Sequence, residues 1–244
     1  MIQPPIPFTV AIPTMRRFKF LEKAVPLYLD NPLINAVTIC DETGEDIQQI
    51  EKTAWGKHPK LRLHRNPKRL GMYYNKRKCL EVAPTDWVAV LDSDNIFPEA
   101  FFETLFDLWR DEGADQKTVY ASGQIVRVFL KTGDSEERTR QFSGLRISKS
   151  NWNSVLKTKA WNFLLNDGNW IGHKSLLKAW PTDIAEEQIR ATDSIRIVRN
   201  FILNGFTYFV VPELRYIHTV HDDSEWTKTE AESSYLLATT DWTI

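Results

Sequence analysis

The sequence has few cysteines, no long hydrophobic run and almost no net charge, and these absences exclude several classes of protein. Cys40 and Cys79 are the only cysteines among 244 residues, and they do not form a metal-binding pair such as Cys-x-x-Cys. A zinc site built on cysteine is therefore not expected. We interpret both residues as buried free thiols, because each lies in an apolar or helical stretch.

No stretch approaches the ~18 apolar residues that a membrane span requires, and the opening MIQPPIPFTVAIP lacks the basic and apolar regions of a signal peptide. The net charge of −1 argues against a broad basic surface for nucleic acid. The local cluster HRNPKRL still allows a small anionic ligand. We therefore expect a cytoplasmic protein, at most peripheral to a membrane, that binds no nucleic acid. The sequence gives no indication of an oligomeric state.

What the sequence does contain is a repeated order of short apolar strands and helical segments. Its 42% of hydrophobic residues is typical of one large globular domain. Strands are predicted at residues 8–12, 36–40, 61–64 and 86–91, and a helical pattern follows each of the first three. This alternation predicts βαβ units, and hence an α/β fold with a mostly parallel sheet between layers of helices.

The second half of the chain is less regular. The pattern predicts a helix that ends at Gly113, and then a hairpin that begins with VYASGQIVRVFL. A further helix lies within TDSIRIVRNFILNG and ends at Asn204-Gly205, followed by two short strands, FTYFVVP and LRYIH. The residues from Asp222 onward have no pattern that assigns them to an element.

Polar side chains follow the predicted strands, at the edge where open α/β sheets bind their ligands. Thr14 follows the first strand, Asp41 follows the second, and WVAVLDSDN places Asp92 and Asp94 after the fourth. We expect these residues to gather on one edge of the sheet. Two carboxylates this close repel each other unless a cation or a hydrogen-bond donor balances them. The alternative is a solvated acidic loop.

Four pieces in this order resemble glycosyltransferase family 2, the inverting nucleotide-sugar glycosyltransferases of the GT-A fold. They are VAIPTMRR, VTICDETGED, LHRNPKRLGMYYNKRKCLEVAPTDWVAVLDSDN and TDSIRIVRNFILNGFTYFVVPELRYIH, within residues 8–221. One Asp-x-Asp motif is weak evidence, but each piece also falls at a predicted strand end or helix start. The resemblance implies a single GT-A catalytic domain over 1–221, an α/β/α sandwich. A nucleotide-sugar half would cover about 1–95 and an acceptor half about 96–221, with a C-terminal extension at 222–244.

The resemblance implies a metal-dependent transfer from a nucleotide sugar to a hydroxyl group of a glycan acceptor. A divalent cation, Mn²⁺ or Mg²⁺, would bridge the phosphates of the leaving group, whose negative charge grows as the glycosidic bond breaks. Asp94 is implied as the direct metal ligand, and Asp92 as a ligand of the metal or the ribose. His218 is implied as a further ligand, with His221 as its competitor, although a histidine after a strand is more often a packed residue.

The nucleoside is implied to lie along the same edge. Asp41 matches the carboxylate that accepts a hydrogen bond from the base, so a UDP sugar is the expected donor, with thymidine and guanosine donors still open. A turn-stabilising role is the alternative for Asp41. The residues implied to lie near the nucleotide sugar are Pro13, Thr14, Arg16, Asp41, Arg69, Gly71, Asp92, Ser93 and Trp170. Trp170 would stack on the sugar, with Trp152 and Trp161 in an acceptor groove, and core packing is the alternative for Trp161.

Asp193 is implied as the catalytic base, because it opens the helix where the family places an acidic pair. Inversion requires a base that removes the proton of the acceptor hydroxyl. A helix-capping role is the alternative. The sequence departs from the family twice, with ATD in place of the acidic pair and Arg77 where asparagine is common. A solvated helix face is an equal interpretation of Lys76, Arg77 and Lys78.

Two other functions are compatible with parts of the pattern. A sugar-phosphate nucleotidyltransferase shares a related sheet, but it usually has a glycine-rich basic loop after the first strand, where this chain reads IPTMRRF. A nucleotide-sugar-binding or carbohydrate-binding domain that has lost its chemistry would explain both departures. Donor hydrolysis separates the last alternative from an active transferase.

Overall fold

The computed structural model describes residues 6–184, 189, 192–224, 228 and 230–244. In this part of the chain nine strands form one mixed sheet, in the order β3-β2-β1-β4-β8-β5-β9-β7, with β6 paired to β5 off this path. The strands are β1 (Phe8–Thr14), β2 (Ala36–Asp41), β3 (Leu61–Arg65), β4 (Trp87–Val90), β5 (Thr118–Phe129), β6 (Ser135–Arg138), β7 (Arg146–Ile147), β8 (Trp170–His173) and β9 (Thr207–Val220). The helices include α1 (Phe18–Asp30), α2 (Glu45–Ile50), α3 (Met72–Val82), α4 (Glu99–Glu112), α5 (Trp152–Val155), α6 (Trp161–Leu165), α8 (Asp193–Leu203) and α10 (Glu230–Thr239), with short 3-10 helices η1 (Arg140–Phe142) and η2 (Lys174–Ala179).

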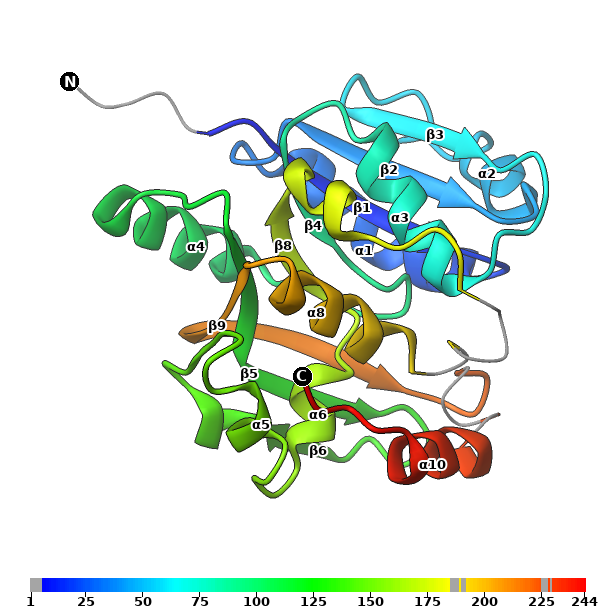
Figure 1. Ribbon diagram of the computed structural model, residues 1–244. Helices are drawn as coiled ribbons and strands as arrows, with labels where there is room; N and C mark the ends of the chain where they lie inside the picture. The colour runs from blue at the N-terminus through cyan, green and yellow to red at the C-terminus, as the bar shows by residue number, and fades with distance from the viewer. Residues whose placement is uncertain (1–5, 185–188, 190–191, 225–227, 229) are drawn as a thin grey trace.

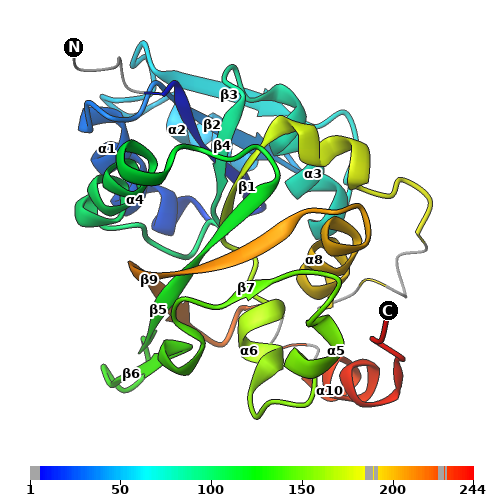
Figure 2. The ribbon, with the colours of Figure 1, turned by 60° about the vertical axis from the view of Figure 1, so that its left-hand side comes forward.

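The first four strands pair in parallel, as the alternating pattern predicts. Strands β1, β2 and β4 lie between two hydrophobic cores, because successive side chains of a strand point to opposite faces of the sheet. Val10 and Ile12 of β1 pack into the core formed with α1 and α4, whereas Ala11 packs into the core formed with α3 and α8. These helix layers on the two faces of the sheet are visible in Figures 1 and 2. The predicted α/β fold with flanking helices is confirmed.

The sheet becomes mixed beyond β4. Strand β8 is antiparallel to both β4 and β5, and β9 is parallel to β5. The predicted hairpin forms between β5 and β6, with Val126 opposite Glu137. The two short strands predicted after α8 are a single strand, β9, whose register against β5 shifts between Ser122 and Gln124. Pro212 lies opposite this shift, and since proline has no N–H for the ladder, an irregularity here is expected.

The C-terminal residues, for which the sequence gives no assignment, pack onto the face of the sheet that carries α8. Trp242 is 5% exposed and belongs to the same core as α3 and α8. Its carbonyl oxygen accepts a hydrogen bond of 2.8 Å from Nε1 of the buried Trp152. The C-terminus accordingly lies beside α8 in both views (Figures 1 and 2). None of the described helices has the length and apolarity needed to cross a bilayer.

Candidate active site

The carboxyl ends of β1, β2 and β4 meet at one edge of the sheet. Thr14 at the end of β1 pairs with Asp41 at the end of β2, and the acidic turn that contains Asp92 and Asp94 directly follows β4. Helix α8 brings Asp193 to the same edge from a distant part of the sequence, because α3 and α8 pack side by side. The polar residues that follow the strands therefore do gather, as the parallel topology predicts.

Lys76 connects the acidic turn to the start of α8. Its Nζ lies 3.2 Å from Oδ1 of Asp92 and 3.0 Å from Oδ2 of Asp193, and it donates a hydrogen bond of 3.3 Å to Oγ of Ser194. The side chain of Lys76 is only 2% exposed. One buried ammonium group thus holds together two carboxylates that are about a hundred residues apart in the sequence.

The neighbouring charges shift the pKa values of Lys76 and Asp92. Burial alone would lower the pKa of Lys76, but the carboxylates of Asp193 and Asp92 outweigh it and raise that pKa, so the side chain is an ammonium ion. Burial raises the pKa of Asp92, and the nearby charges of Asp94 and Asp193 add to this, while Lys76 opposes it. One positive charge shared between two acids therefore leaves the acidic turn with negative charge that is only partly balanced.

Gly168 allows the backbone to pass directly over this ion pair. A Cβ atom at position 168 would overlap Oδ2 of Asp92 and Nζ of Lys76. Only glycine fits here without displacing the two charged groups. The backbone at Gly168 therefore approaches the side chains of Asp92 and Lys76 closely.

Asn169 holds the acidic turn in shape. Its Oδ1 accepts hydrogen bonds from the backbone N–H of Asp92 at 2.8 Å and from the amide of Asn95 at 3.3 Å. The Oδ1 atom of Asn95 in turn accepts the backbone N–H of Thr219 at 2.9 Å. Both asparagines are 1% exposed, so these bonds lie in a water-excluded interior where they fix the turn.

Asp94 points to a different set of partners from Asp92. Its Oδ2 lies 3.0 Å from Nε2 of His221 and 3.8 Å from the guanidinium of Arg17. Burial would raise the pKa of Asp94, but the hydrogen bond to His221 and the charge of Arg17 outweigh it, and the net effect is a lowered pKa. Asp94 is therefore a carboxylate at neutral pH. The structure brings His221 rather than His218 into contact with it.

The described residues supply only part of the coordination shell of a divalent cation. In the described residues no group of three His, Cys, Asp or Glu side chains is placed to hold a metal ion. Asp94 and His221 offer one oxygen and one nitrogen, and burial lowers the pKa of His218 to about 4, which keeps the His218 imidazole neutral. Six ligands are typical for Mg²⁺ and Mn²⁺, so these side chains fit such an ion only if phosphate oxygens and water supply the rest.

Asp41 is turned into its own loop. Its Oδ1 accepts the backbone N–H of Thr43 at 3.0 Å and its Oδ2 accepts that of Ile47 at 2.9 Å. The residue is fully buried. These contacts correspond to the turn-stabilising role of Asp41. A contact between Asp41 and the nucleobase stays a prediction. Glu42, the next residue, accepts the backbone N–H of Leu70 at 2.6 Å, and burial raises its pKa.

The other residues implied to bind the donor lie along the same edge with different exposures. Thr14 donates a 2.6 Å hydrogen bond to Asp46, whose carboxylate also accepts the backbone N–H of Arg17. Arg16 is exposed, has a φ of 58° and lies 3.0 Å from Glu45. Pro13 and Ser93 are buried, and Arg69 is exposed. Gly71, with a φ of 79°, directly precedes α3.

Comparison with known proteins decides the family. The model of the family described as glycosyl transferase family 2 matches residues 9–176, more than half of the chain. The chain belongs to glycosyltransferase family 2. No curated protein matches the sequence. The match confirms the resemblance carried by the strand-end motifs, and it contains Lys76, Asp92 and Asp94.

Solved structures show the same fold. TarS of S. aureus, residues 1–349 in complex with UDP-GlcNAc, aligns with a TM-score of 0.66 at 14% identity, covering 97% of this chain and 62% of that chain. The complex of TarS 1–349 with UDP gives 0.65 at 15% identity, covering 97% of this chain and 67% of that chain. This family 2 member therefore spans less than two thirds of the first of these structures. The likeness supports the GT-A fold.

Two of the three tryptophans implied to form the sugar and acceptor surface are core residues in this family 2 chain. Trp170 is fully buried, with its ring 5.5 Å from Phe201, because β8 lies inside the sheet with helices over its face. The implied stacking of Trp170 on a sugar is therefore corrected to core packing. Trp152 is also fully buried.

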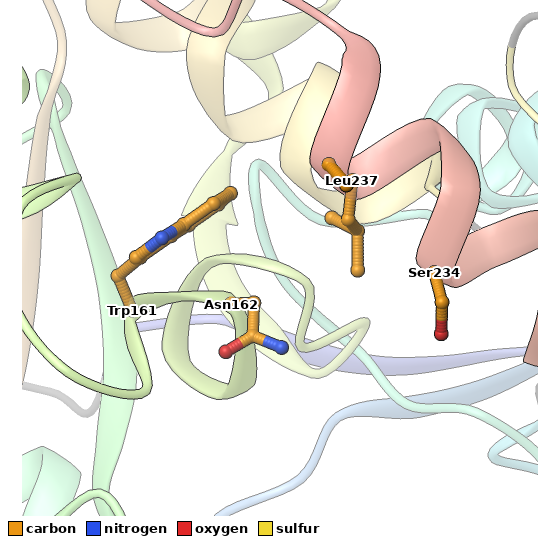
Figure 3. Close-up of a pocket in the computed structure, with 5 residues that line it drawn as sticks. Trp161, Asn162, Ser234 and Leu237 are labelled. Carbon is orange, nitrogen blue, oxygen red and sulfur yellow. The ribbon is translucent and has the colours of Figure 1, made fainter.

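Trp161 is the exception. It lines a cavity of about 300 Å³ together with Asn162 of α6 and residues of α10, and Figure 3 shows its indole facing Leu237 across the opening. The cavity also contains the hydroxyl of Ser234. Trp161 is partly buried against the core, and its place in an acceptor groove stays a prediction.

Sequence reasoning missed three members of the site. The helical pattern does not distinguish Lys76 from its neighbours Arg77 and Lys78. Only the packing of α3 against α8 shows that Lys76 is buried. The sequence assigns no role to Asn169 or Asp167. Burial raises the pKa of Asp167 to about 7, although the side chain accepts hydrogen bonds from Tyr216 at 2.6 Å and Asn169 at 2.8 Å.

Proposed function

We propose that this chain transfers a sugar from a UDP sugar to a hydroxyl group of a glycan acceptor, by a single metal-assisted displacement that inverts the anomeric carbon. The donor proposal rests on family membership and on the TarS structures that contain UDP and UDP-GlcNAc. We place the nucleotide-sugar half at about residues 1–95 and the acceptor half at about 96–221, with an extension at 222–244.

One observation carries the proposal: the same buried ammonium contacts Asp92 of the acidic turn and Asp193 of α8. The turn is the region expected to hold the diphosphate, and Asp193 is the expected base. A transferase needs these two groups on opposite sides of one reacting carbon. Lys76 places them within one ion-pair cluster, which supports a shared site rather than two unrelated acidic loops.

Asp193 is placed to remove a proton rather than only to cap α8. Its Oδ2 contacts Lys76, and in the described part of the chain Oδ1 accepts no hydrogen bond. The acceptor hydroxyl would donate to Oδ1, and its proton would move to that oxygen as the hydroxyl attacks the anomeric carbon. The residue before it, Thr192, is the cap position of the helix.

Asp94 with His221 or His218 would hold a divalent cation, and Arg17 would stand beside it. When bound, Mn²⁺ or Mg²⁺ supplies positive charge to the departing nucleoside diphosphate. The protein's own contribution is to keep Asp94 ionised and both imidazoles close, while Asn169 and Gly168 fix the turn that carries the carboxylates.

Donor hydrolysis and donor binding test the proposal without an acceptor. A panel of sugar nucleotides is screened by thermal shift with and without Mn²⁺, because a ligand that binds only the folded state raises its melting temperature. The best donor is then used in a hydrolysis assay. We expect Asp193→Asn to lower turnover at least ~100-fold, the usual contribution of a general base, while UDP affinity stays near that of the wild type. Asn also favours helix starts, so this change preserves any helical role.

Asp107→Asn on the exposed face of α4 is the matched control and should leave turnover unchanged. The transferase proposal fails if no sugar nucleotide gives metal-dependent turnover and Asp193→Ala leaves binding and activity unaltered. A protein that binds UDP but never turns over would support the non-catalytic alternative.

A further inference from the structure

A second cavity, of about 270 Å³, lies between α8 and the C-terminal segment. Its described lining includes Arg196, Arg199 and Asn200 of α8 and Thr240, Asp241 and Trp242 of the C-terminal segment. The proposed chemistry assigns no role to any of these residues, although the three from α8 lie within the sequence stretch that begins at Thr192 and resembles the family. Its composition differs from that of the core, because two guanidinium groups face a single carboxylate.

Arg196 has unused hydrogen-bonding capacity. In the described part of the chain its guanidinium makes no ion pair or hydrogen bond, and its Nε is buried without a partner. It lies over the ring of Trp242, 5.0 Å from the centroid. Buried donors are nearly always paired in folded proteins, so an orphaned guanidinium N–H at a cavity wall points to a ligand.

The surrounding charges favour an anion. The described lining has two guanidinium groups and one carboxylate. Burial and the neighbouring charge of Arg199 both lower the pKa of Arg196, an effect that a bound anion would oppose. Arg199 donates to the carbonyl oxygens of Trp242 at 3.2 Å and Thr243 at 2.7 Å rather than to a carboxylate. Asp241 is the one carboxylate of the described lining, and its Oδ1 already accepts the hydroxyl of Thr243 at 2.7 Å.

The cavity lies beside the site proposed for catalysis. Arg196 is three positions after Asp193 on α8, and side chains at this spacing share a helix face with Cβ atoms about 5–6 Å apart. Tyr73, which is 1% exposed, lies within electrostatic range of both. A group held at Arg196 would therefore be one helical turn from the expected base, on the side where an acceptor must approach.

We propose that this cavity binds an anionic group of the acceptor, a phosphate or a carboxylate, between Arg196 and Arg199. The inference rests on the proposed function and names its acceptor as a charged glycan. Guanidinium groups match the oxygens of both anions in pairs of parallel hydrogen bonds. The guanidinium of Arg196 already contacts the ring of Trp242. This contact reduces the conformational freedom that the Arg196 side chain loses when an anion binds.

Phosphate and glucuronate binding at Trp242 test the inference in the full-length protein. The indole N–H signal of Trp242 in a ¹H–¹⁵N spectrum reports on the cavity directly, and Trp242→Phe assigns it. We expect inorganic phosphate or glucuronate to shift this signal saturably. Arg196→Gln should weaken the binding at least about tenfold, and Arg110→Gln, an exposed arginine of α4, should not. Saturation by phosphate alone identifies a phosphate-bearing acceptor, and saturation by glucuronate alone identifies a uronate.

The inference is overturned if neither anion moves the Trp242 signal, or if Arg196→Gln lowers the melting temperature but leaves the titration unchanged. The second result would mean that Arg196 only holds the C-terminal segment. UDP binding is measured on the same samples by calorimetry. A protein that binds UDP but shows no Trp242 response overturns this inference alone. A Trp242 response without UDP binding overturns the proposed function and, with it, the assignment of the anion to an acceptor.

Discussion

Lys76 shows how much depends on one side chain at this site. A buried ion pair is costly to form, because both groups lose their hydration, and it persists only where the geometry is good. Here one ammonium serves Asp92 and Asp193 and also donates to Ser194. Lys76 therefore holds the two acids in position, without needing to contact a substrate.

Removing the ammonium should be far more damaging than removing an exposed one. We expect Lys76→Met to lower the free energy of unfolding by about 3–5 kcal/mol, because two buried carboxylates lose their partner. Lys78→Met is the matched control on the same helix, where the half-buried pair with Glu81 at 2.6 Å should contribute less than about 1 kcal/mol. Urea unfolding at pH 7 measures both. Equal losses in the two variants would show that Lys76 is not a buried partner of the acids.

At the scale of elements, the loop between α6 and β8 contributes more than a connection. Residues 166–169 supply the oxygen that accepts the N–H of Ile195, the glycine over the ion pair and the amide that shapes the acidic turn. Asp167 lies in the middle of this loop, 7% exposed and held by Tyr216 and Asn169. Burial of an acid in such a place couples the stability of the loop to pH.

Asp167 should make the protein less stable as the pH rises. Burial raises its pKa from 3.8 to about 7, so the folded state binds this proton more tightly than the unfolded state does. The stabilising effect is complete below pH ~4 and is lost as the pH rises through about 7, a difference of roughly 2–4 kcal/mol. Asp167→Asn is neutral at every pH and should melt at a higher temperature than the wild type at pH 8 but not at pH 5.

The control for this prediction is Asp134→Asn in the exposed β5–β6 turn, which should keep the wild-type dependence on pH. Melting temperatures at several pH values compare the three proteins. Parallel curves for the wild type and Asp167→Asn would show that Asp167 has an ordinary pKa in the folded state.

At the scale of the whole molecule, the C-terminal segment is part of the fold. Trp242 adds its ring to the core between the sheet and α8, and its carbonyl satisfies the indole of Trp152. The cavity at Trp161 and the cavity at Arg196 both have a wall formed by residues after 230. The segment thus forms part of both cavities.

Truncating Trp242 should therefore destabilise the entire domain. We expect Trp242→Ala to cost about 3–5 kcal/mol, the usual range for a buried large aromatic residue. Tyr235→Ala on α10 is the control, since Tyr235 is 66% exposed and exposed substitutions usually change stability by less than about 0.5 kcal/mol. Urea unfolding gives both values. A small effect of Trp242→Ala would mean that the segment is loosely attached.

Much of the fold and part of the site could be predicted from the sequence, for identifiable reasons. The four parallel strands and helices α1, α3 and α4 follow local periodicity, and the positions of Thr14, Asp41 and Asp92 at one edge follow from parallel topology alone. The course of β9 could not be predicted, because a proline such as Pro212 usually ends a strand. Only the pairing with β5 shows that β9 continues past it. The prediction for Trp170 was also wrong. The local sequence around an aromatic residue is the same whether its side chain is buried in the core or exposed to a ligand.

The sequence by itself determined the family, the edge of the sheet that carries the acids and the identity of Asp193 as the candidate base, because these depend on short-range pattern and on order along the chain. Only the tertiary structure decided that Lys76 is buried between Asp92 and Asp193, that His221 faces Asp94, and that the guanidinium of Arg196 lies over the ring of Trp242. Charge–charge contacts between residues far apart in the chain depend on which helix faces pack together. No local pattern encodes that choice.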